Sequence, residues 1–367
     1  MKWANLEALI SAIRAFVPEL ASAKHKGQAG KIAVIGGCRE YTGAPFFAAF
    51  STLKLGADIA HVFCSREAAP VIKAYSPELI VHPALRESYD VKLDTPGQRK
   101  EIVDAAVKTV SDWLPRMDCV VIGPGLGRDS LVQECVADIM SAARQASIPM
   151  VIDADGLHLV SNQPHLISGY PLAILTPNVN EFARLSQVVA SQCDSTAAAA
   201  AVTSGPSNPG NSLAQLAADL GNVTIVQKGA ADGISDGNAV FECGLFGSPR
   251  RCGGQGDVLS GSIAVFFVWA RKWQQRLQEQ QQQRLQEQQQ QGGVPFDDEM
   301  QQLVAEQLSD NPAVLAAFAG SLVVRRAAAD AFAKHKRSMT TTNIIECLGD
   351  CFEDLFPVGS WEPQPNL

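Results

Sequence analysis

Short apolar runs that each precede a helical stretch recur along the chain, and this alternation constrains the fold more than any other feature. The runs are rich in β-branched residues and lie at 31–37, 61–64, 79–82, 119–123, 150–153, 173–175 and 223–228. Several are continuously apolar, as expected for strands buried on both faces of a sheet. Helical stretches such as 44–55 and 131–146 follow them. The sequence therefore predicts right-handed βαβ units, in an α/β fold with a mostly parallel central sheet and helices on both faces.

The alternation continues from residue 31 to beyond residue 257 without a clear linker. At 367 residues the chain could form one large or two ordinary domains, and the unbroken pattern favours a single domain over residues 1–355. Residues 356–367 include three prolines and are predicted to form a loose tail.

A glutamine-rich stretch at about residues 273–293 departs from this pattern. It contains the string QRLQEQQQ twice, at 275–282 and again at 283–290. Because apolar side chains are scarce in it, it can bury little surface. We expect an insertion that is disordered or a solvated helix and that projects away from the functional site. Residues 204–211 are a second expected loop insertion.

The net charge limits the classes of binding partner to expect, and the cysteine content indicates the redox state of the compartment. The formal net charge of −8 argues against nucleic acid or an anionic membrane as the main partner, although nucleotides need only a local positive pocket. The nine cysteines include no C-x-x-C pair, so we expect free thiols in a reducing compartment. The N-terminus is a poor signal peptide, and no apolar stretch is long enough to span a membrane. We therefore expect a cytoplasmic protein that binds small molecules, and a homo-oligomer is compatible with such a sheet.

The turn at residues 247–257, GSPRRCGGQGD, is suited to binding phosphate. Glycine lacks a Cβ, so the backbone can adopt positive φ and bring N–H groups close to an anion. The apolar helix expected after the turn adds unpaired N–H groups and the positive end of its dipole. Asp257 is costly beside phosphate, and its simplest role is a base that takes a proton from a hydroxyl attacking a phosphoryl group. The alternative is an ordinary helix N-cap.

Other turns at the expected carboxyl ends of strands carry candidate groups, each with a structural alternative. Asp153 and Asp155 could share a metal or a proton if they point to one face of a strand, or they could cap the next helix. The glycines of residues 123–127 could let a ligand lie against the backbone, or they could form a tight turn.

Two further candidates follow in the chain. Asn178 and Glu181 could form a capping box, or Glu181 could hold a water bound to Mg²⁺ near phosphates. Lys228 ends a predicted strand and could reach a nucleotide phosphate, or it could be an ordinary surface lysine. The sequence contains no complete G-x-G-x-x-G, Walker or G-x-S-x-G motif, so it supports neither a Rossmann site nor nucleophilic hydrolysis.

Taken in order, these motifs resemble those of the ribokinase-like superfamily, in which N-x-x-E serves Mg²⁺ and phosphate and G-x-G-D supplies an anion hole and a base. Here they are residues 178–181 and 254–257. Within that superfamily the chain is similar to the ATP-dependent NAD(P)H-hydrate dehydratase family, over about residues 10–350 apart from the glutamine-rich insertion. The strings that carry this resemblance are YTGAP (41–45), SPEL (76–79), GPGLG (123–127), TPN (176–178), KGA (228–230) and RRCGGQGD (250–257).

The resemblance implies repair of the S epimer of hydrated NADH or NADPH, with ATP as co-substrate: ATP phosphorylates the ring hydroxyl, and phosphate then leaves. Asp257 would be the catalytic base, the N–H groups of residues 253–256 would stabilise the transferring phosphoryl group, and Glu181 would hold Mg²⁺ through water. The substrate-binding residues it implies are Gly125, Asn178, Val179, Asn180, Glu181, Phe182, Ala183, Arg184 and Asp257. The ATP-binding residues it implies are Lys228, Gly229, Ala230, Ala231, Asp232, Gly247, Ser248, Pro249, Arg250, Arg251, Cys252, Gly253, Gly254, Gln255 and Gly256.

Two other functions remain open from the sequence. A kinase of the same superfamily, acting on a vitamin precursor or a sugar, would keep Asp257 and the anion hole but would end with a stable phosphoester. The strings at 41–45 and 123–127 favour the dehydratase. A non-catalytic nucleotide-binding regulator is disfavoured, because such a protein gains nothing from a carboxylate that faces phosphate.

Overall fold

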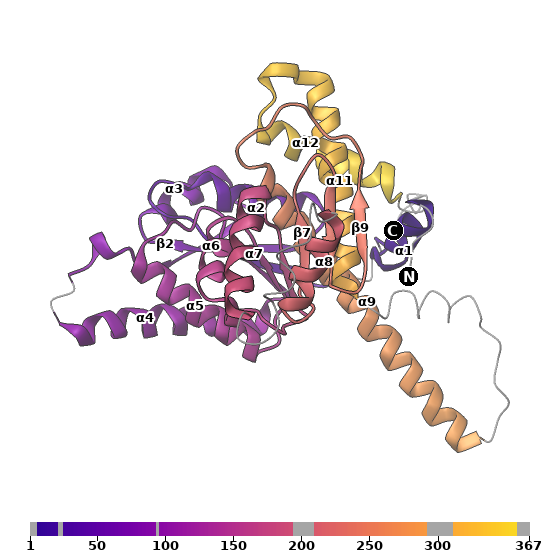
Figure 1. Cartoon of the computed structure of the whole chain (residues 1–367), viewed down its shortest axis with the longest axis horizontal. Coiled ribbons are helices and arrows are strands. Elements are labelled where there is room, and N and C mark those ends of the chain that lie inside the picture. The colour runs from indigo at the N-terminus through magenta and orange to yellow at the C-terminus, as the bar shows by residue number, and fades with distance from the viewer. Residues whose placement is uncertain (1–5, 21–24, 93–94, 194–208, 292–310, 358–367) are drawn as a thin grey trace, which may run out of the picture.

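The computed structural model describes residues 6–20, 25–92, 95–193, 209–291 and 311–357, and Figure 1 shows their arrangement. Within these residues one nine-stranded sheet forms the centre, in the order β3-β2-β1-β4-β5-β6-β7-β8-β9. The seven strands from β3 to β7 in this order are parallel, and β8 and β9 extend the sheet as antiparallel strands. Helices cover both faces, so the predicted fold class is confirmed.

The strands coincide with the predicted apolar runs, and two more follow them. Their bounds are β1 (Lys31–Ile35), β2 (Ile59–Ser65), β3 (Ile80–Leu85), β4 (Cys119–Ile122), β5 (Met150–Ile152), β6 (Ala173–Leu175), β7 (Thr224–Gln227), β8 (Asp232–Ser235) and β9 (Val240–Cys243). The last two were not predicted, because they are short and lack a continuous apolar run.

The helices form two layers. Their bounds are α1 (Leu6–Phe16), α2 (Gly43–Lys54), α3 (Ala68–Tyr75), α4 (Pro96–Ser111), α5 (Ser130–Gln145), α6 (Ala154–Asn162), α7 (Val179–Cys193), α8 (Pro209–Asp219), α9 (Gln255–Gln291), α11 (Pro312–His335) and α12 (Thr341–Leu355). The first three pack with α9, α11 and α12 in one core, and α4 to α8 form the other. Along β1, Ile32 and Val34 belong to the first core whereas Ala33 and Ile35 belong to the second, which explains why the predicted strands are apolar throughout.

The long helix α9 begins in the glycine-rich turn and ends far outside the body of the protein (Figure 1). Residues 258–270 are buried against the sheet, whereas Gln275, Arg276 and Gln278 are exposed. The glutamine-rich stretch is therefore helical as far as Gln291, and of the two expected alternatives disorder is wrong for that part. Residues 292–293 lie outside the described residues, as do residues 204–208 of the second expected insertion.

Deleting the second glutamine-rich copy, residues 283–290, should leave the melting temperature nearly unchanged and the turnover within about twofold of the parent, because a stretch whose only apolar residue is Leu285 buries little apolar surface. Thermal unfolding and the dehydration assay described below check this. A large loss of turnover in a protein that still folds would show that the segment acts on the site.

One helical stretch among the described residues, Pro312–Ser338, could cross a membrane by length and composition alone. In the structure 78% of its most apolar window is buried, and α11 packs against both α9 and α12. Such burial is typical of the central helix of a globular core.

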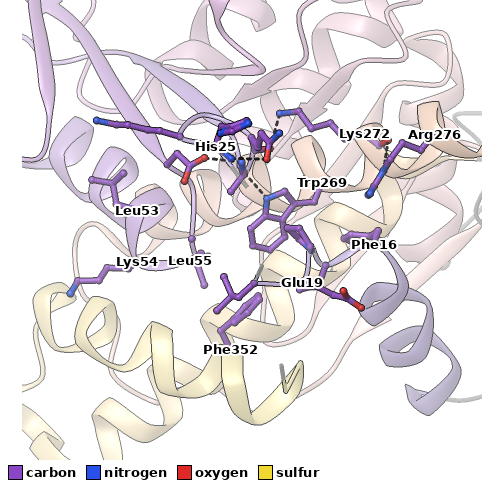
Figure 2. A pocket seen from close by; sticks show the side chains of 18 of the residues that line it. Phe16, Glu19, His25, Leu53, Lys54, Leu55, Trp269, Lys272, Arg276 and Phe352 are labelled. Atoms are coloured by element: carbon purple, nitrogen blue, oxygen red, sulfur yellow. Dashed lines mark hydrogen bonds between the residues drawn. The ribbon is translucent and has the colours of Figure 1, made fainter. Parts of the chain in front are cut away.

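A cavity of about 860 Å³ lies at the amino edge of the sheet, where β1 and β2 begin (Figure 2). Trp269 of α9 is one of the residues that line it, and its indole N–H donates to the carbonyl of Ala29 at 2.6 Å. Lys272 of the same helix donates to the carbonyl of Gln28 at 3.2 Å. These contacts anchor α9 to the segment before β1, at the edge opposite the predicted phosphate-binding turn.

Candidate functional site

The carboxyl ends of β5, β6 and β7 bring Asp153, Thr176 and Lys228 together, because these strands are parallel neighbours. The Lys228 Nζ lies 2.8 Å from Asp153 Oδ1, and the Thr176 hydroxyl donates to the same oxygen at 2.8 Å. The Asp153 side chain is 2% exposed and that of Lys228 is 21% exposed. The surface-lysine alternative for Lys228 is therefore wrong, since this lysine belongs to a mostly buried ion pair.

Asp153 and Asp155 do not act as a pair. Strand β5 ends at Ile152, and Asp153 occupies the N-cap position of α6 without a side-chain capping bond. Asp155 lies in the first turn of α6, accepts a hydrogen bond from the Gly127 N–H at 3.0 Å and pairs with Arg128 at 3.3 Å. The two carboxylates thus bind different partners, and the prediction that strand geometry pairs them is wrong because the strand stops before them.

Asp257 lies in the first turn of α9, two residues after the helix begins. The residue at the N-cap position is Gly254, whose carbonyl accepts from the Val258 N–H at 3.0 Å, so the N-cap alternative for Asp257 is wrong. Burial, followed by the charge of Asp153, raises the pKa of Asp257 to about 8, although Lys228 acts in the opposite direction. Asp155 adds to the rise. A carboxyl group with this pKa is suited to accept a proton near neutral pH.

The glycines of the turn are required by close contacts as well as by conformation. Gly254 has a φ of +101°, and a Cβ there would lie 2.7 Å from the ring of Phe47. A Cβ on Gly256 would lie 3.2 Å from Lys228 Nζ and 3.5 Å from Asp153 Oδ2. By contrast, a Cβ on Gly253 would meet nothing within 4 Å, so the turn is open at that residue. The helix N-terminus beside it offers N–H groups to an anion.

A cavity of about 560 Å³ opens beside this turn. The residues from the predicted sites that line it are Asn178, Val179, Asn180, Lys228, Gly229, Asp232, Gly247, Ser248, Arg251, Cys252, Gln255 and Gly256. It is also lined by residues that the sequence analysis did not predict, namely Leu259, Ser321, Val324, Arg325 and Ala328. Those residues come from α9 and α11, where an apolar helical pattern signals only a core helix. The structure thus gathers most of the predicted ATP-binding residues, and part of the predicted substrate segment, around one cavity.

Asp232 lines the cavity, but its carboxylate binds protein groups. Arg325 pairs with it through Nε at 2.8 Å and Nη2 at 2.7 Å, and the Gly229 N–H donates to it at 3.1 Å. Arg325 also donates to the carbonyls of Gly229, Ala230 and Leu245 at 2.7–3.0 Å. This arginine therefore fixes the loop between β7 and β8 and the chain after β9. Asp232 contributes to the cavity wall by holding Arg325 and Gly229, because its carboxylate is occupied by their bonds. Ala231 is half-buried within the same loop.

The loop at residues 249–253 is held by Met339, which lies just before α12, and by Thr341, the first residue of α12. Arg250 Nε donates to the carbonyl of Met339 at 2.8 Å, and the Cys252 thiol donates to the same oxygen at 3.1 Å. The Thr341 hydroxyl donates to the carbonyl of Gly253 at 2.6 Å. Pro249 is exposed.

The motif at residues 178–181 forms the capping box of α7. The Asn178 Oδ1 accepts from the N–H groups of Asn180 and Glu181 at 2.9 and 3.0 Å, and Glu181 Oε2 accepts from the Asn178 N–H at 2.8 Å. Burial raises the pKa of Glu181, against the opposing effects of its bond to Asn178 and of the Lys228 charge. Further along α7, Phe182 is buried in the second core, while Ala183 and Arg184 are exposed.

The glycines of residues 123–127 allow neighbouring chain segments to approach closely, because they have no Cβ. Gly123 has a φ of +120°, and a Cβ there would lie 1.9 Å from the carbonyl oxygen of Asp153. Gly125 has a φ of +60°, and a Cβ there would lie 2.6 Å from the carbonyl oxygen of Tyr41. The tight-turn alternative accounts for these glycines, and substrate contact by Gly125 stays a prediction.

Comparison with solved structures defines the fold class as ribokinase-like. A ribokinase-like superfamily protein from Enterococcus faecalis V583 superposes with a TM-score of 0.62, at 20% identity, over 95% of this chain and 95% of that one. The ADP/ATP-dependent NAD(P)H-hydrate dehydratase from Bacillus subtilis, co-crystallised with ATP/Mg²⁺, gives a TM-score of 0.60 at 18% identity, over 94% and 97%. At such identities these likenesses concern the fold alone.

Sequence comparison defines the family. The NAD(P)H-hydrate dehydratase family model matches residues 32–289. A relative from Physcomitrium patens, the ATP-dependent (S)-NAD(P)H-hydrate dehydratase, is 52% identical over 348 residues, which are 94% of this chain and 95% of the relative. The chain belongs to the NAD(P)H-hydrate dehydratase family, as its motifs predicted.

Proposed function

We propose that this protein uses ATP to dehydrate the S epimer of hydrated NADH or NADPH and so regenerates the reduced dinucleotide. The observation that carries the proposal is Asp257, a carboxyl group with a pKa of about 8 at the phosphate-binding start of α9, in a chain of the dehydratase family. The names of its relatives specify both the dependence on ATP and the hydrate as substrate.

The chemistry needs two steps, because hydroxide is a poor leaving group. Asp257 accepts the proton of the ring hydroxyl while the hydroxyl oxygen attacks the γ-phosphorus of ATP and ADP leaves. The lone pair of the ring nitrogen then expels phosphate, and loss of a ring proton restores the carbon–carbon double bond. The products are NAD(P)H, ADP and phosphate, so one ATP is consumed for each water removed.

The residues around the cavity divide these tasks. Lys228 supplies a positive charge beside the base; burial opposes that charge, but Asp153, Glu181 and Asp257 together raise its pKa. The N–H groups at the start of α9 face the position expected for the transferring phosphoryl group, where developing charge is stabilised. The loop that Arg325 fixes and the turn at residues 247–256 form the walls in which ATP would lie.

Carboxylates around Lys228 fit a magnesium ion that is bound through water. Asp153, Glu181 and Asp257 all act on the charge of this one ammonium group, and Mg²⁺ prefers carboxylate oxygens and retained water molecules. Glu181 would hold the ion indirectly, and a bound Mg²⁺ would neutralise charge on the ATP phosphates.

Replacing Glu181 with Gln should raise the Mg²⁺ concentration needed for half-maximal activity by ~10–100-fold, the usual effect of a group that orients a metal's ligands. Gln can still accept from the Asn178 N–H, so unfolding free energy should fall by less than ~2 kcal/mol. Mg²⁺ titrations of activity and of ATP binding, beside denaturant unfolding, check this. A stability loss with an unaltered Mg²⁺ response would leave Glu181 with the capping role alone.

Among the cysteines whose side chains the structure describes, all are free and all but Cys252 are buried. We propose a reducing, cytoplasmic setting on this basis, together with a partner set limited to hydrated NAD(P)H and ATP. Fractionation of the native protein tests the setting.

A further inference from the structure

A buried serine hydroxyl at the cavity beside the glycine-rich turn has no hydrogen-bond partner. Ser321 of α11 lines this cavity and is fully buried, and its Oγ bonds to no described residue. Four buried side-chain atoms in the described part of the chain lack a partner, and Ser321 Oγ is the only one of them whose residue lines this cavity. Burial of an unpaired hydroxyl costs free energy. Its place at a cavity indicates that a ligand supplies the missing bond.

Other buried serines in the helices show the alternative that Ser321 does not adopt. The hydroxyls of Ser51, Ser161 and Ser262 each donate to the carbonyl four residues earlier, at 2.6–2.8 Å. Such a bond satisfies a serine inside a helix without any outside group. Ser321 makes no such bond to the residues that the structure describes. Its hydroxyl can therefore rotate about χ1 to face the cavity without losing a partner.

The side chains around Ser321 are apolar, unlike those in the rest of the cavity. Leu259 of α9 lines the cavity together with Val324 and Ala328 of α11, and the two helices pack against each other. Val324 and Ala328 lie three and seven residues after Ser321, so the three share one face of α11. We call Leu259, Ser321, Val324 and Ala328 the helix slot. Its only polar side chain is the Ser321 hydroxyl.

The charged groups next to the helix slot are bound by other protein groups. Arg325 pairs with Asp232 at 2.7 Å and donates to three carbonyls. Lys228 pairs with Asp153 at 2.8 Å and lies beside Gly256, at the phosphate-binding start of α9. A phosphate group would therefore gain no charge contact in the slot. A flat heterocycle fits it, because its faces can contact apolar side chains while one atom of its edge bonds to the hydroxyl.

We propose that the helix slot holds the adenine base of ATP and that the Ser321 hydroxyl makes the polar contact to its edge. A hydroxyl can donate to a ring nitrogen or accept from the exocyclic amino group. The phosphates would then lie at the start of α9, which offers N–H groups to an anion. The inference rests on the proposed function, because it concerns the nucleotide that the reaction consumes. It adds α11 to the ATP-binding elements, which the sequence motifs place only at residues 228–232 and 247–256.

The first test is Ser321→Ala, with ATP and inorganic tripolyphosphate as probes in the presence of Mg²⁺. The Kd for ATP should rise ~3–10-fold, as expected for the loss of one neutral hydrogen bond. Tripolyphosphate has no base, so its Kd should stay within about twofold of the parent. Without nucleotide the variant should melt at the same temperature as the parent or higher, because the change removes a buried hydroxyl that has no partner.

Calorimetric titration and thermal unfolding measure these effects on one preparation. A change of less than about twofold in the Kd for ATP would overturn the proposal. Equal weakening of ATP and tripolyphosphate would also overturn it, since the base would then not be what Ser321 contacts.

Ser262→Ala is the matched control. Ser262 is an equally buried helical serine, and its hydroxyl bonds to the carbonyl of Val258 at 2.7 Å. We expect this variant to bind ATP and tripolyphosphate within about twofold of the parent. A loss of ATP affinity as large as that of Ser321→Ala would overturn the proposal, since any change in the packing of these helices would then suffice.

The second test fills the helix slot. Ala328→Leu should raise the Kd for ATP at least ~10-fold and leave tripolyphosphate binding unchanged, which also shows that the variant is folded. On this background Ser321→Ala should change the Kd for ATP by less than about twofold, because an excluded base does not reach the hydroxyl. Unchanged ATP affinity in Ala328→Leu, or independent, multiplicative losses in the double variant, would overturn the proposal. If Ala328→Leu does not fold, Ala328→Val takes its place.

These titrations contain no hydrated dinucleotide, which separates this inference from the proposed function. If the parent dehydrates the hydrate with ATP but Ser321→Ala binds ATP as the parent does, the role of the helix slot is overturned and the function stands. If ATP binding depends on Ser321 as expected but the parent does not dehydrate the hydrate, the function is overturned and the slot stands.

Discussion

Replacing Asp257 with Asn should lower turnover of hydrated NADH by ~10²–10⁴, the usual contribution of a positioned general base. Asn keeps the size of the side chain and removes its basicity. Above pH about 8, where Asp257 is ionised, it also removes a negative charge beside the site expected for phosphate, so ATP should bind there as tightly as in the parent or more tightly. Steady-state kinetics and a direct measurement of ATP binding on the same preparation check both parts.

The pairing of lost turnover with retained ATP affinity is what distinguishes a base from a structural acid. Asp257 lies in the first turn of α9, where an acid can act solely by its favourable interaction with the helix dipole. In that case the Asn variant would lose some stability and keep its turnover. Turnover within about threefold of the parent would remove Asp257 from the mechanism.

The same substitution should make the protein more stable at neutral and alkaline pH. Folding raises the pKa of Asp257 from 3.8 to about 8, so between these values the folded state binds more protons than the unfolded state. The free energy of unfolding therefore falls as pH rises through that window, because Asp257 opposes folding more as the unfolded state ionises. Above pH about 8 this one contribution no longer changes. Asn does not titrate, so its melting temperature should exceed the parent's by more at pH near 8 than at pH 4. An equal difference at pH 4 and pH 8 would contradict this.

Replacing Arg325 with Ala should cost ~3–5 kcal/mol of unfolding free energy, the usual effect of breaking a buried ion pair on one side. Its side chain is 11% exposed and that of Asp232 is 8% exposed. The change leaves the Asp232 carboxylate without its cation and three carbonyls without their donor. Because those carbonyls shape the ATP cavity, ATP affinity should fall as well. Denaturant unfolding and ATP binding measure the two effects.

The next residue provides a matched control for Arg325. Arg326 pairs with Asp330 at 3.1 Å and Asp354 at 3.6 Å, but its side chain is 43% exposed. Surface pairs of this kind contribute ~0–1 kcal/mol, so Arg326→Ala should change stability little and leave ATP affinity unchanged. Equal losses in the two variants would show that burial of the Arg325 pair contributes nothing beyond a surface contact.

The sequence predicted the parallel strands and the phosphate-binding turn because both depend on local pattern. Continuous apolar runs mark β1 to β7, and glycines before an acid mark the start of α9. The partner of Lys228 escaped prediction because Asp153 lies 75 residues away in the chain. Local pattern assigned Asp153 to a metal pair or a helix cap, whereas strand order places it beside Lys228.

Arg325 escaped prediction for the same reason, since 93 residues separate it from Asp232. It lies in an alanine- and valine-rich helix whose pattern indicates only burial. The long-range contacts that complete the site thus come from strand order and helix packing. A single sequence specifies these only through the fold as a whole.

The most direct test of the proposed activity is to supply the purified protein with hydrated NADH, ATP and Mg²⁺ and to record the absorbance of NADH together with the phosphate released. We expect NADH to form only from the S epimer and only with ATP, with one ADP and one phosphate for each NADH. Formation of a stable phosphorylated hydrate, or no reaction of the S epimer while ATP is hydrolysed, would contradict the account.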